Sequence, residues 1–103
     1  MSQFDNVSVI TKPNVYFDGL CVSYTVLFAD ASRKTVGVIF PATLTFNTGA
    51  PEVMEIVGGR CRVLLPGESA WRDIVAGESF NVPGQSSFQI EAPERVDYIC
   101  HFV

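Results

Sequence analysis

The side chains that could carry metal or nucleophilic chemistry are few and widely separated in this sequence. The single histidine, His101, follows Cys100 in a strand-like run, where neighbouring side chains face opposite ways, so the two do not form a chelating pair. The cysteines, Cys21, Cys61 and Cys100, are odd in number and have no Cys-x-x-Cys spacing, which favours reduced, buried thiols. We interpret His101 as a surface or partly satisfied side chain.

A second set of residues could bind an anion. Arg60 and Arg62 lie two residues apart, on one face of an expected strand, and Arg33-Lys34 precedes another. An arginine fork matches phosphate in a bidentate way. The alternative for Arg60 and Arg62 is an outward, solvated face, since Cys61 and Val63 would then alternate inward. Both interpretations stay open from the sequence.

The chain that must position these residues has 103 residues, a formal net charge of −4 and 48% hydrophobic residues. This length and apolar content predict one packed domain. The acidic balance and the absence of a Lys/Arg cluster argue against nucleic-acid binding. No apolar run approaches a membrane span, and the first residues lack the regions of a signal peptide. We expect a soluble, cytoplasmic protein with no nucleic-acid or membrane partner.

Short runs rich in Val, Ile, Thr and Phe, separated by turn residues, predict an all-β fold. The expected strands are 6–11, 14–17, 22–28, 35–40, 43–48, 53–57, 60–65, 79–82, 86–91 and 96–103. Gly58-Gly59 is typical of a two-residue hairpin. Residues 71–75 are expected to be extended, although the apolar spacing in 69–75 also allows a helical turn. So many short strands indicate a sandwich or a barrel.

Two Gly/Pro-marked segments resemble the paired motifs of the cupin family. Glu52, six further residues and Gly59 match the end of the first motif, and Gly77 followed by Pro83 and Gly84 nearly matches the second. The positions of the motif histidines hold other residues, namely Thr45 and Asn47 or Phe46 and Thr48 in the first motif and Ser87 in the second. Since metal-binding cupins need those imidazoles, we expect no metal. The resemblance implies a single-domain jelly-roll β-barrel over 1–103, with 1–13 as an N-terminal extension or edge strand.

About eight ordered blocks carry a closer resemblance. They are 16–19, 32–38, 45–48, 50–54, 63–67 with Trp71, 77–83, 86–88 and 98–100. Together they resemble the pyrimidine/purine nucleoside phosphorylase family of small cupins over most of 14–103. The resemblance implies phosphorolysis of purine and pyrimidine nucleosides to free base and ribose 1-phosphate, with inorganic phosphate as co-substrate, no cofactor and a homodimer. The alternative function is a non-catalytic cupin module that binds a small ligand.

The resemblance makes Glu52 the leading candidate for the ribose. A carboxylate can accept hydrogen bonds from two hydroxyls, and its charge favours a cationic sugar. Thr45, Asn47 and Thr48 are candidate polar contacts to phosphate or base, with ordinary strand propensity as the alternative. Further candidate substrate contacts are Phe46, Met54, Phe80, Ser87, Phe88, Tyr98, Arg60 and Arg62. The aromatic side chains among them, with Phe102, could stack on a base or serve only the core.

Overall fold

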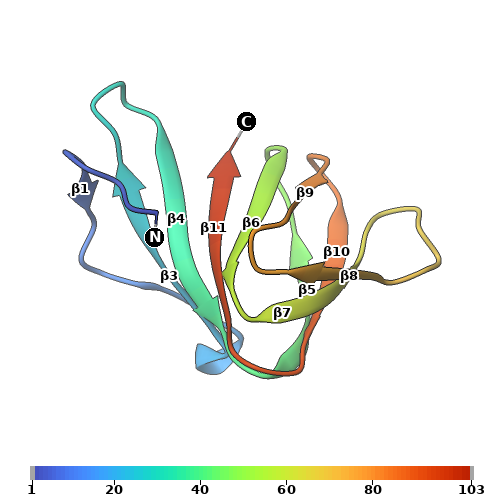
Figure 1. The fold of residues 1–103 in the computed structure, drawn as a ribbon. Coiled ribbons are helices and arrows are strands. Elements are labelled where there is room, and N and C mark those ends of the chain that lie inside the picture. Colours follow the sequence, from blue (N-terminus) through green and yellow to red (C-terminus); the bar gives the residue numbers. More distant parts are fainter. Residues whose placement is uncertain (1, 103) are drawn as a thin grey trace.

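The computed structural model describes residues 2–102, which form eleven strands and one short 3-10 turn. The elements are β1 (Ser8–Val9), β2 (Asn14–Tyr16), η1 (Phe17–Gly19), β3 (Cys21–Leu27), β4 (Arg33–Ile39), β5 (Ala42–Asn47), β6 (Glu52–Gly58), β7 (Arg60–Leu64), β8 (Arg72–Val75), β9 (Ser79–Val82), β10 (Ser87–Ala92) and β11 (Val96–Phe102). The large sheet has the order β1-β3-β4-β11-β6-β9, with β2 also paired to β3, and the small sheet has the order β5-β10-β7-β8 (Figure 1). The expected all-β jelly roll is confirmed.

The two sheets meet near η1 and diverge toward the opposite end (Figure 1). Alternation along each strand sends every second side chain between the sheets. In β10, for example, Phe88, Ile90 and Ala92 are buried, and they pack with fully buried Ile39 and Ile56 of the large sheet. This core ties the sheets together and leaves their divergent ends free to enclose a cavity.

The strand register arranges the inward side chains of the large sheet in rows that change character along the strands. At the convergent end the row is apolar, with Cys21, Ile39 and Val96. The next two rows carry small polar side chains, with Tyr98 in the first of the two. The outermost row contains the charged side chains of Arg33 and Glu52. In order, these rows are Ser23-Gly37-Tyr98, Thr25-Thr35-Cys100-Met54, and the pairs Leu27-Arg33 and Phe102-Glu52. The divergent end is therefore lined by groups that can bind a ligand.

The ends of the predicted strands agree with the structure to within two residues. Of the run 6–11, only Ser8–Val9 forms a strand, at the edge of the large sheet against β3. The segment expected to be extended at 71–75 contains β8 and no helical turn. Phe17, expected at the end of a strand, belongs to η1 instead. Val103 lies outside the described residues.

The hairpin predicted at Gly58-Gly59 is wrong. β6 lies in the large sheet and β7 in the small one, so this dipeptide forms a corner between the sheets. Gly59 has φ +79°, and a Cβ there would lie 2.4 Å from the carbonyl oxygen of Arg95. Glycine pairs allow any sharp change of direction. The pairing is instead decided by tertiary packing, in which β6 lies between β11 and β9.

The expectations for cysteine and histidine are confirmed. Cys21, Cys61 and Cys100 are buried and free. His101 lies on the outer face of the large sheet, where Lys34 Nζ lies 2.8 Å from Nδ1 and Glu55 Oε1 lies 2.9 Å from Nε2. Within residues 2–102, no helix has the length and apolar character needed to cross a membrane.

Candidate active site

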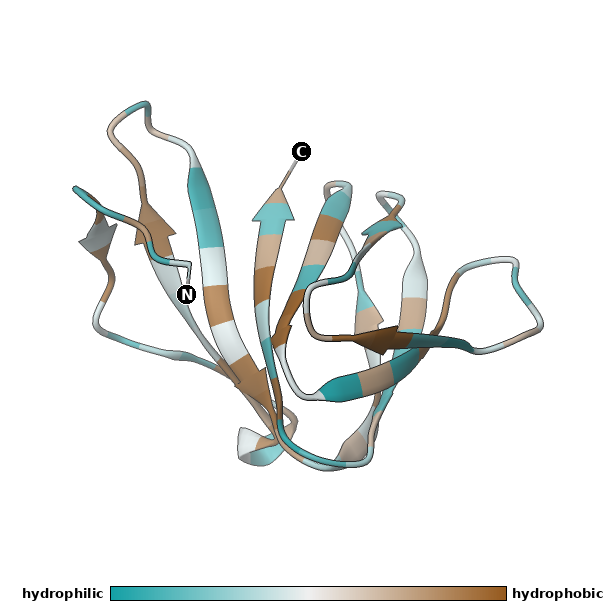
Figure 2. Ribbon diagram, in the orientation of Figure 1, coloured by the Kyte–Doolittle hydropathy of each residue, from teal (hydrophilic) through white to brown (hydrophobic). Residues whose placement is uncertain are grey.

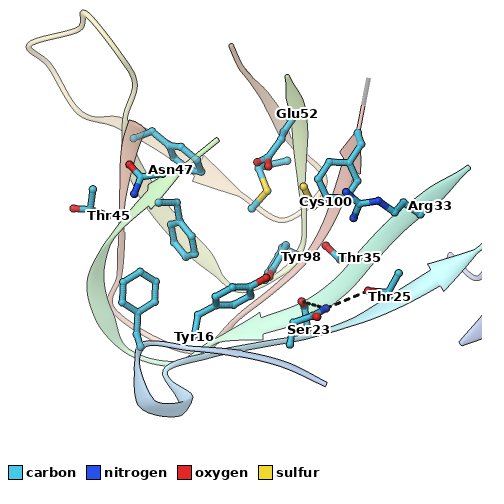
Figure 3. A pocket seen from close by; sticks show the side chains of 16 residues that line it. Tyr16, Ser23, Thr25, Arg33, Thr35, Thr45, Asn47, Glu52, Tyr98 and Cys100 are labelled. Atoms are coloured by element: carbon cyan, nitrogen blue, oxygen red, sulfur yellow. Dashed lines mark hydrogen bonds between the residues drawn. The ribbon is translucent and has the colours of Figure 1, made fainter. Parts of the chain in front are cut away.

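A cavity of about 450 Å³ opens between the divergent ends of the two sheets (Figure 3). Its lining comes from β2, η1, β3, β4, β5, β6, β10 and β11. A volume of this size is typical of small-molecule sites. The lining residues fall into a polar wall, an aromatic wall and a carboxylate at the mouth.

The polar wall consists of Asn14, Ser23, Thr25, Arg33 and Thr35. Asn14 lies opposite Ser23 in the β2–β3 register, and its amide donates to Ser23 Oγ at 3.3 Å and to Thr25 Oγ1 at 3.2 Å. Among residues 2–102, Arg33 is the one Lys or Arg side chain that lines the cavity. An arginine at this position gives the wall a local positive charge in a protein of net charge −4.

Arg33 is held at the mouth by an aromatic ring. Its guanidinium carbon lies 4.2 Å from the centroid of the Phe102 ring, a cation–π arrangement. Arg33 is exposed to solvent, and in Figure 3 it lies on the side of the cavity that carries Thr35 and Thr25. Its position favours contact with an anion that enters from solvent.

The aromatic wall consists of Phe17, Phe46 and Phe88. The rings of Phe46 and Phe88 stack with centroids 5.6 Å apart, and Phe17 meets Phe46 edge to face at 5.3 Å. Phe17 has φ +53°, an unusual value for a bulky residue, and this left-handed turn aims the ring at the cavity. Such a wall suits a flat, apolar ring system.

Glu52, the first residue of β6, supplies the carboxylate, and Figure 3 shows it between the two walls. Burial raises the pKa of the Glu52 carboxyl, whereas a hydrogen bond with the Cys100 thiol and the charge of Arg33 act to lower it. Burial, together with Glu52, raises the pKa of Cys100 to about 12, so this thiol stays protonated at neutral pH. Glu52 is therefore a half-buried acceptor with few competing partners.

Tyr98 forms the neutral floor of the cavity. Its hydroxyl lies 3.4 Å from Cys21 Sγ, and burial raises the pKa of the phenol well above its usual value. The side chain therefore contributes a hydroxyl and a ring and no charge. The three parts together can hold an anion on one wall, hydroxyl groups near Glu52 and a flat ring on the other wall.

Seven of the residues singled out in the sequence lie in the cavity, namely Arg33, Glu52, Phe46, Met54, Phe88, Tyr98 and Phe102. Thr45 and Asn47 border it, but their side chains are exposed because Leu44 and Phe46 take the inward positions of β5. Figure 3 shows the Thr45 side chain on the outer side of the strand. Thr45 and Asn47 therefore stay candidate contacts at the border of the cavity, and Phe46 takes the inward position between them.

The structure places the other five candidates outside the cavity. Phe80 is a core residue, 6.0 Å edge to face from Phe88, and Ser87 is exposed because Phe88 faces inward. Arg60 is exposed on β7, as is expected when Cys61 is buried beside it. Arg62 donates to both carboxylate oxygens of Glu91, at 2.9 and 2.8 Å, and stacks 4.8 Å over Trp71. The outward interpretation of this arginine pair is the one that the structure supports.

Thr48, the fifth of these candidates, joins two loops instead of facing a ligand. Its buried hydroxyl donates to the Pro83 carbonyl at 2.7 Å and accepts from the Ser86 backbone N–H at 3.1 Å. The same two segments are joined by the backbone bond from Thr48 N–H to Ser86 O at 2.8 Å. Thr48 therefore stabilises the loops that flank β5 and β9.

We expect Thr48→Val to lower the free energy of unfolding by about 1–3 kcal/mol, because the buried Thr48 hydroxyl loses its bonds with the Pro83 carbonyl and the Ser86 backbone N–H, and that N–H loses its partner. Urea unfolding measures this change. Thr43→Val, at an exposed position of β5, is the matched control and should shift stability by less than about 0.5 kcal/mol. Equal stability of Thr48→Val and Thr43→Val would contradict the structural role.

Several cavity residues were not recognised as site residues in the sequence. They are Asn14, Tyr16, Phe17, Ser23, Thr25, Thr35 and Cys100. A signal for some of them exists, since Ser23 and Thr25 occupy alternate positions of a strand whose other face carries Val22, Tyr24 and Val26. Small polar residues on the inward face of a strand are unusual in a core. Asn14 and Phe17 carry no comparable signal. They reach the cavity only because β2 pairs with β3 and the short turn η1 follows β2, and local sequence patterns do not report this pairing.

Comparison with known proteins gives consistent matches over nearly the whole chain. Residues 11–102 match the family described as pyrimidine/purine nucleoside phosphorylase. A protein of that name from Cupriavidus pinatubonensis is 68% identical over 99% of this chain and 97% of its own, and one from Dechloromonas aromatica is 66% identical over 99% of both chains.

Solved structures resemble this fold closely. A protein of unknown function from Acinetobacter sp. ADP1 is 52% identical, with a TM-score of 0.96 over 98% of both chains. One from Vibrio parahaemolyticus is 36% identical, with a TM-score of 0.85 over 93% of this chain and 99% of its own. The two-sheet arrangement around the cavity is thus shared with experimentally determined structures.

Proposed function

This chain belongs to the pyrimidine/purine nucleoside phosphorylase family, and from that premise we propose that its cavity binds a nucleoside and inorganic phosphate and transfers the ribose from the base to the phosphate. The products are the free base and ribose 1-phosphate. The assignment to this cavity rests on one observation. The polar wall, with Arg33, and the aromatic wall lie on either side of Glu52.

The arrangement fits an in-line displacement. A phosphate oxygen at the polar wall forms a bond to C1′ while the C1′–N bond breaks on the side of the aromatic wall. The electron pair of that bond leaves with the base, which takes up the proton that the phosphate loses. Positive charge develops on the ribose as the bond breaks, as in glycoside cleavage generally. Glu52 accepts hydrogen bonds from the ribose hydroxyls, and its negative charge stabilises the cationic sugar.

Acceptance of both purines and pyrimidines follows from how the base is held. Stacking on Phe46 and Phe88 needs only a flat ring, which every base provides. A site that reads base edges would instead need polar side chains aimed into the aromatic wall. Stacking of this kind supports broad base specificity, and the proposed transfer of ribose to phosphate makes the enzyme a pentosyltransferase.

The test of the proposed function is base release from uridine and from adenosine, measured by chromatography with and without phosphate. We expect release of both bases only when phosphate is present, with one ribose 1-phosphate formed per base. If the nucleoside raises the melting temperature but no base is released, the protein is a binding module. Release without phosphate would identify a hydrolase.

We propose that the reaction proceeds without a metal cofactor. The cupin ligand positions hold Thr45, Asn47 and Ser87, which are poor ligands for first-row metal ions. Phosphorolysis can be accelerated by positioning and by the charges of Arg33 and Glu52. We therefore expect dialysis against a chelator to leave kcat and KM unchanged. Loss of activity that a divalent ion restores would contradict this expectation.

We also propose a homodimer that buries the outer face of the large sheet. Figure 2 shows hydrophobic residues along β3, β4, β11 and β6, and Tyr24 and Val57 of this face are exposed. A depression lined by Phe4, Val36 and Val38 adds to the same apolar surface. A symmetric partner would cover this surface. Light scattering should give twice the chain mass of 11.3 kDa, and Val57→Lys should give a monomer, whereas a monomeric wild-type protein would contradict the proposal.

We place the enzyme in the cytoplasm. The three free, buried cysteines support a reducing compartment, since pairs of cysteines in exported proteins are usually oxidised to disulfides. Nucleosides and phosphate are the proposed partners, and nothing in the charge distribution favours a nucleic acid.

A further inference from the structure

The polar wall of the cavity places three hydroxyl groups beside its one cation. Ser23 and Thr25 face inward from β3, and Thr35 lies directly opposite Thr25 on β4. Arg33 lies two residues before Thr35, so the two side chains share one face of β4. Cross-strand neighbours lie about 5 Å apart and next-but-one residues about 7 Å apart. Four donors at these spacings can surround one tetrahedral anion.

Asn14 determines which way two of these hydroxyls point. Its amide nitrogen lies 3.3 Å from Ser23 Oγ and 3.2 Å from Thr25 Oγ1, and in both bonds the amide donates. Each hydroxyl oxygen therefore accepts from Asn14, and the hydroxyl hydrogen of Thr25 is available for another acceptor, whereas Ser23 also bonds to the Tyr98 hydroxyl, so a ligand must compete for its hydrogen. The wall consequently presents O–H donors toward the cavity. A ligand that only accepts hydrogen bonds, as the oxygens of a phosphate do, complements such a wall.

The positive charge of Arg33 and the negative charge of Glu52 lie at different places in the cavity. Glu52 lies on β6, and β11 separates β6 from β4, so the carboxylate is on the far side of Phe102 from Arg33. Phe102 therefore lies between the two charges, although the charge of Arg33 still reaches Glu52 and lowers the pKa of its carboxyl. In Figure 3, Arg33, Thr35, Thr25 and Ser23 lie on one side of the cavity, and Thr45 and Asn47 of β5, which carries Phe46, lie on the other. An in-line attack on C1′ needs this opposition of phosphate and base.

We propose that Ser23, Thr25 and Thr35 form, together with Arg33, the phosphate subsite of this cavity, and that Asn14 is a positioning residue that directs the hydroxyl hydrogens of Ser23 and Thr25 at the phosphate. This assignment rests on the proposed phosphorolysis, which requires a phosphate site. In this subsite the anion is bound by neutral donors on β3 and β4 as well as by the Arg33 guanidinium.

The test separates the KM for phosphate from the KM for uridine. Thr25→Val removes the hydroxyl at nearly constant shape and should raise the KM for phosphate about tenfold, because one hydrogen bond to a charged group is lost. The KM for uridine should change less than about twofold. Thr25→Ser should restore the phosphate KM, and Thr43→Val, on the exposed face of β5, should leave both constants unchanged. Asn14→Ala should also raise the phosphate KM while the uridine KM stays constant.

The outcomes distinguish this inference from the proposed function. If wild-type protein catalyses phosphorolysis but Thr25→Val raises the uridine KM and leaves the phosphate KM unchanged, the wall binds the nucleoside and the inference is wrong. If wild-type protein shows no phosphorolysis, the proposed function fails, and calorimetric titration with inorganic phosphate then tests the wall directly. Binding that Thr25→Val weakens and Thr25→Ser retains supports the subsite. Absence of binding, or binding that Thr25→Val leaves unchanged, overturns it.

Discussion

Glu52→Gln is expected to lower kcat/KM for uridine and adenosine by at least tenfold and on the order of 100-fold, about 2.7 kcal/mol of transition-state stabilisation. The amide keeps the size of the side chain but loses the negative charge that stabilises the cationic ribose. Glu52→Ala should lose at least tenfold, or about 1.4 kcal/mol, while it keeps the fold. Steady-state kinetics at saturating phosphate measure both variants, and activity retained in either would reject the ribose role.

Thermal unfolding provides the control for this loss. Burial raises the pKa of Glu52 in the folded protein, so the folded state binds the proton more tightly than the unfolded state does. The stability contribution of this group is therefore fully present in acid and is lost as the pH rises through the raised pKa. We expect Glu52→Gln to be at least as stable as wild type at neutral pH and to lose this advantage in acid. A variant that unfolds at neutral pH would show that its inactivity has a structural cause.

Arg33→Gln is expected to raise the KM for phosphate on the order of 100-fold, about 2.7 kcal/mol, because a charge-assisted, bidentate contact is lost in a protein with net charge −4. The KM for uridine should change by less than about threefold. Arg33→Lys keeps the charge but loses the planar fork, so its phosphate KM should fall between those of wild type and Arg33→Gln.

Arg72 supplies the matched control for Arg33. It is exposed on β8, pairs with Glu68 and does not line the cavity. Arg72→Gln makes the same change in net charge, so it should leave the phosphate KM within about twofold if the long-range field is unimportant. A similar rise in both variants would show that net charge, and not contact with Arg33, governs phosphate binding.

Local sequence patterns were sufficient to predict where the strands lie in the chain, but not which strands pair with one another. Alternating β-branched and polar residues predicted Ser79–Val82 without error and the extended form of Arg72–Val75. Gly58-Gly59 was interpreted as a hairpin because the dipeptide reports only a sharp turn. The choice of β11 and β9 as partners of β6 depends on contacts between residues distant in sequence, which local patterns do not contain.

Motif position singled out Glu52 and aromatic character singled out Phe46 and Phe88, and all three line the cavity. The candidates that lie outside the cavity or only at its border share one physical reason, which is that alternate side chains of a strand face opposite ways. Thr45 and Asn47 share β5 with Phe46 but face the opposite way, and Arg62 faces outward because Cys61 and Val63 are buried. Which set of alternating side chains faces inward is decided by the packing of the two sheets. Arg33 was a candidate from the sequence, but the uncharged residues of the polar wall were missed, because Asn14 and Thr25 meet only through the pairing of β2 with β3.

A crystal structure of the protein with ribose 1-phosphate and a free base bound together would show directly whether the cavity holds both products. We expect phosphate oxygens within hydrogen-bond distance of Arg33 and the β3–β4 hydroxyls, ribose hydroxyls on Glu52, and the base stacked on Phe46 or Phe88. Phosphate bound instead at Arg60 and Arg62, or a nucleoside seated on the outer face of the large sheet, would contradict this expectation.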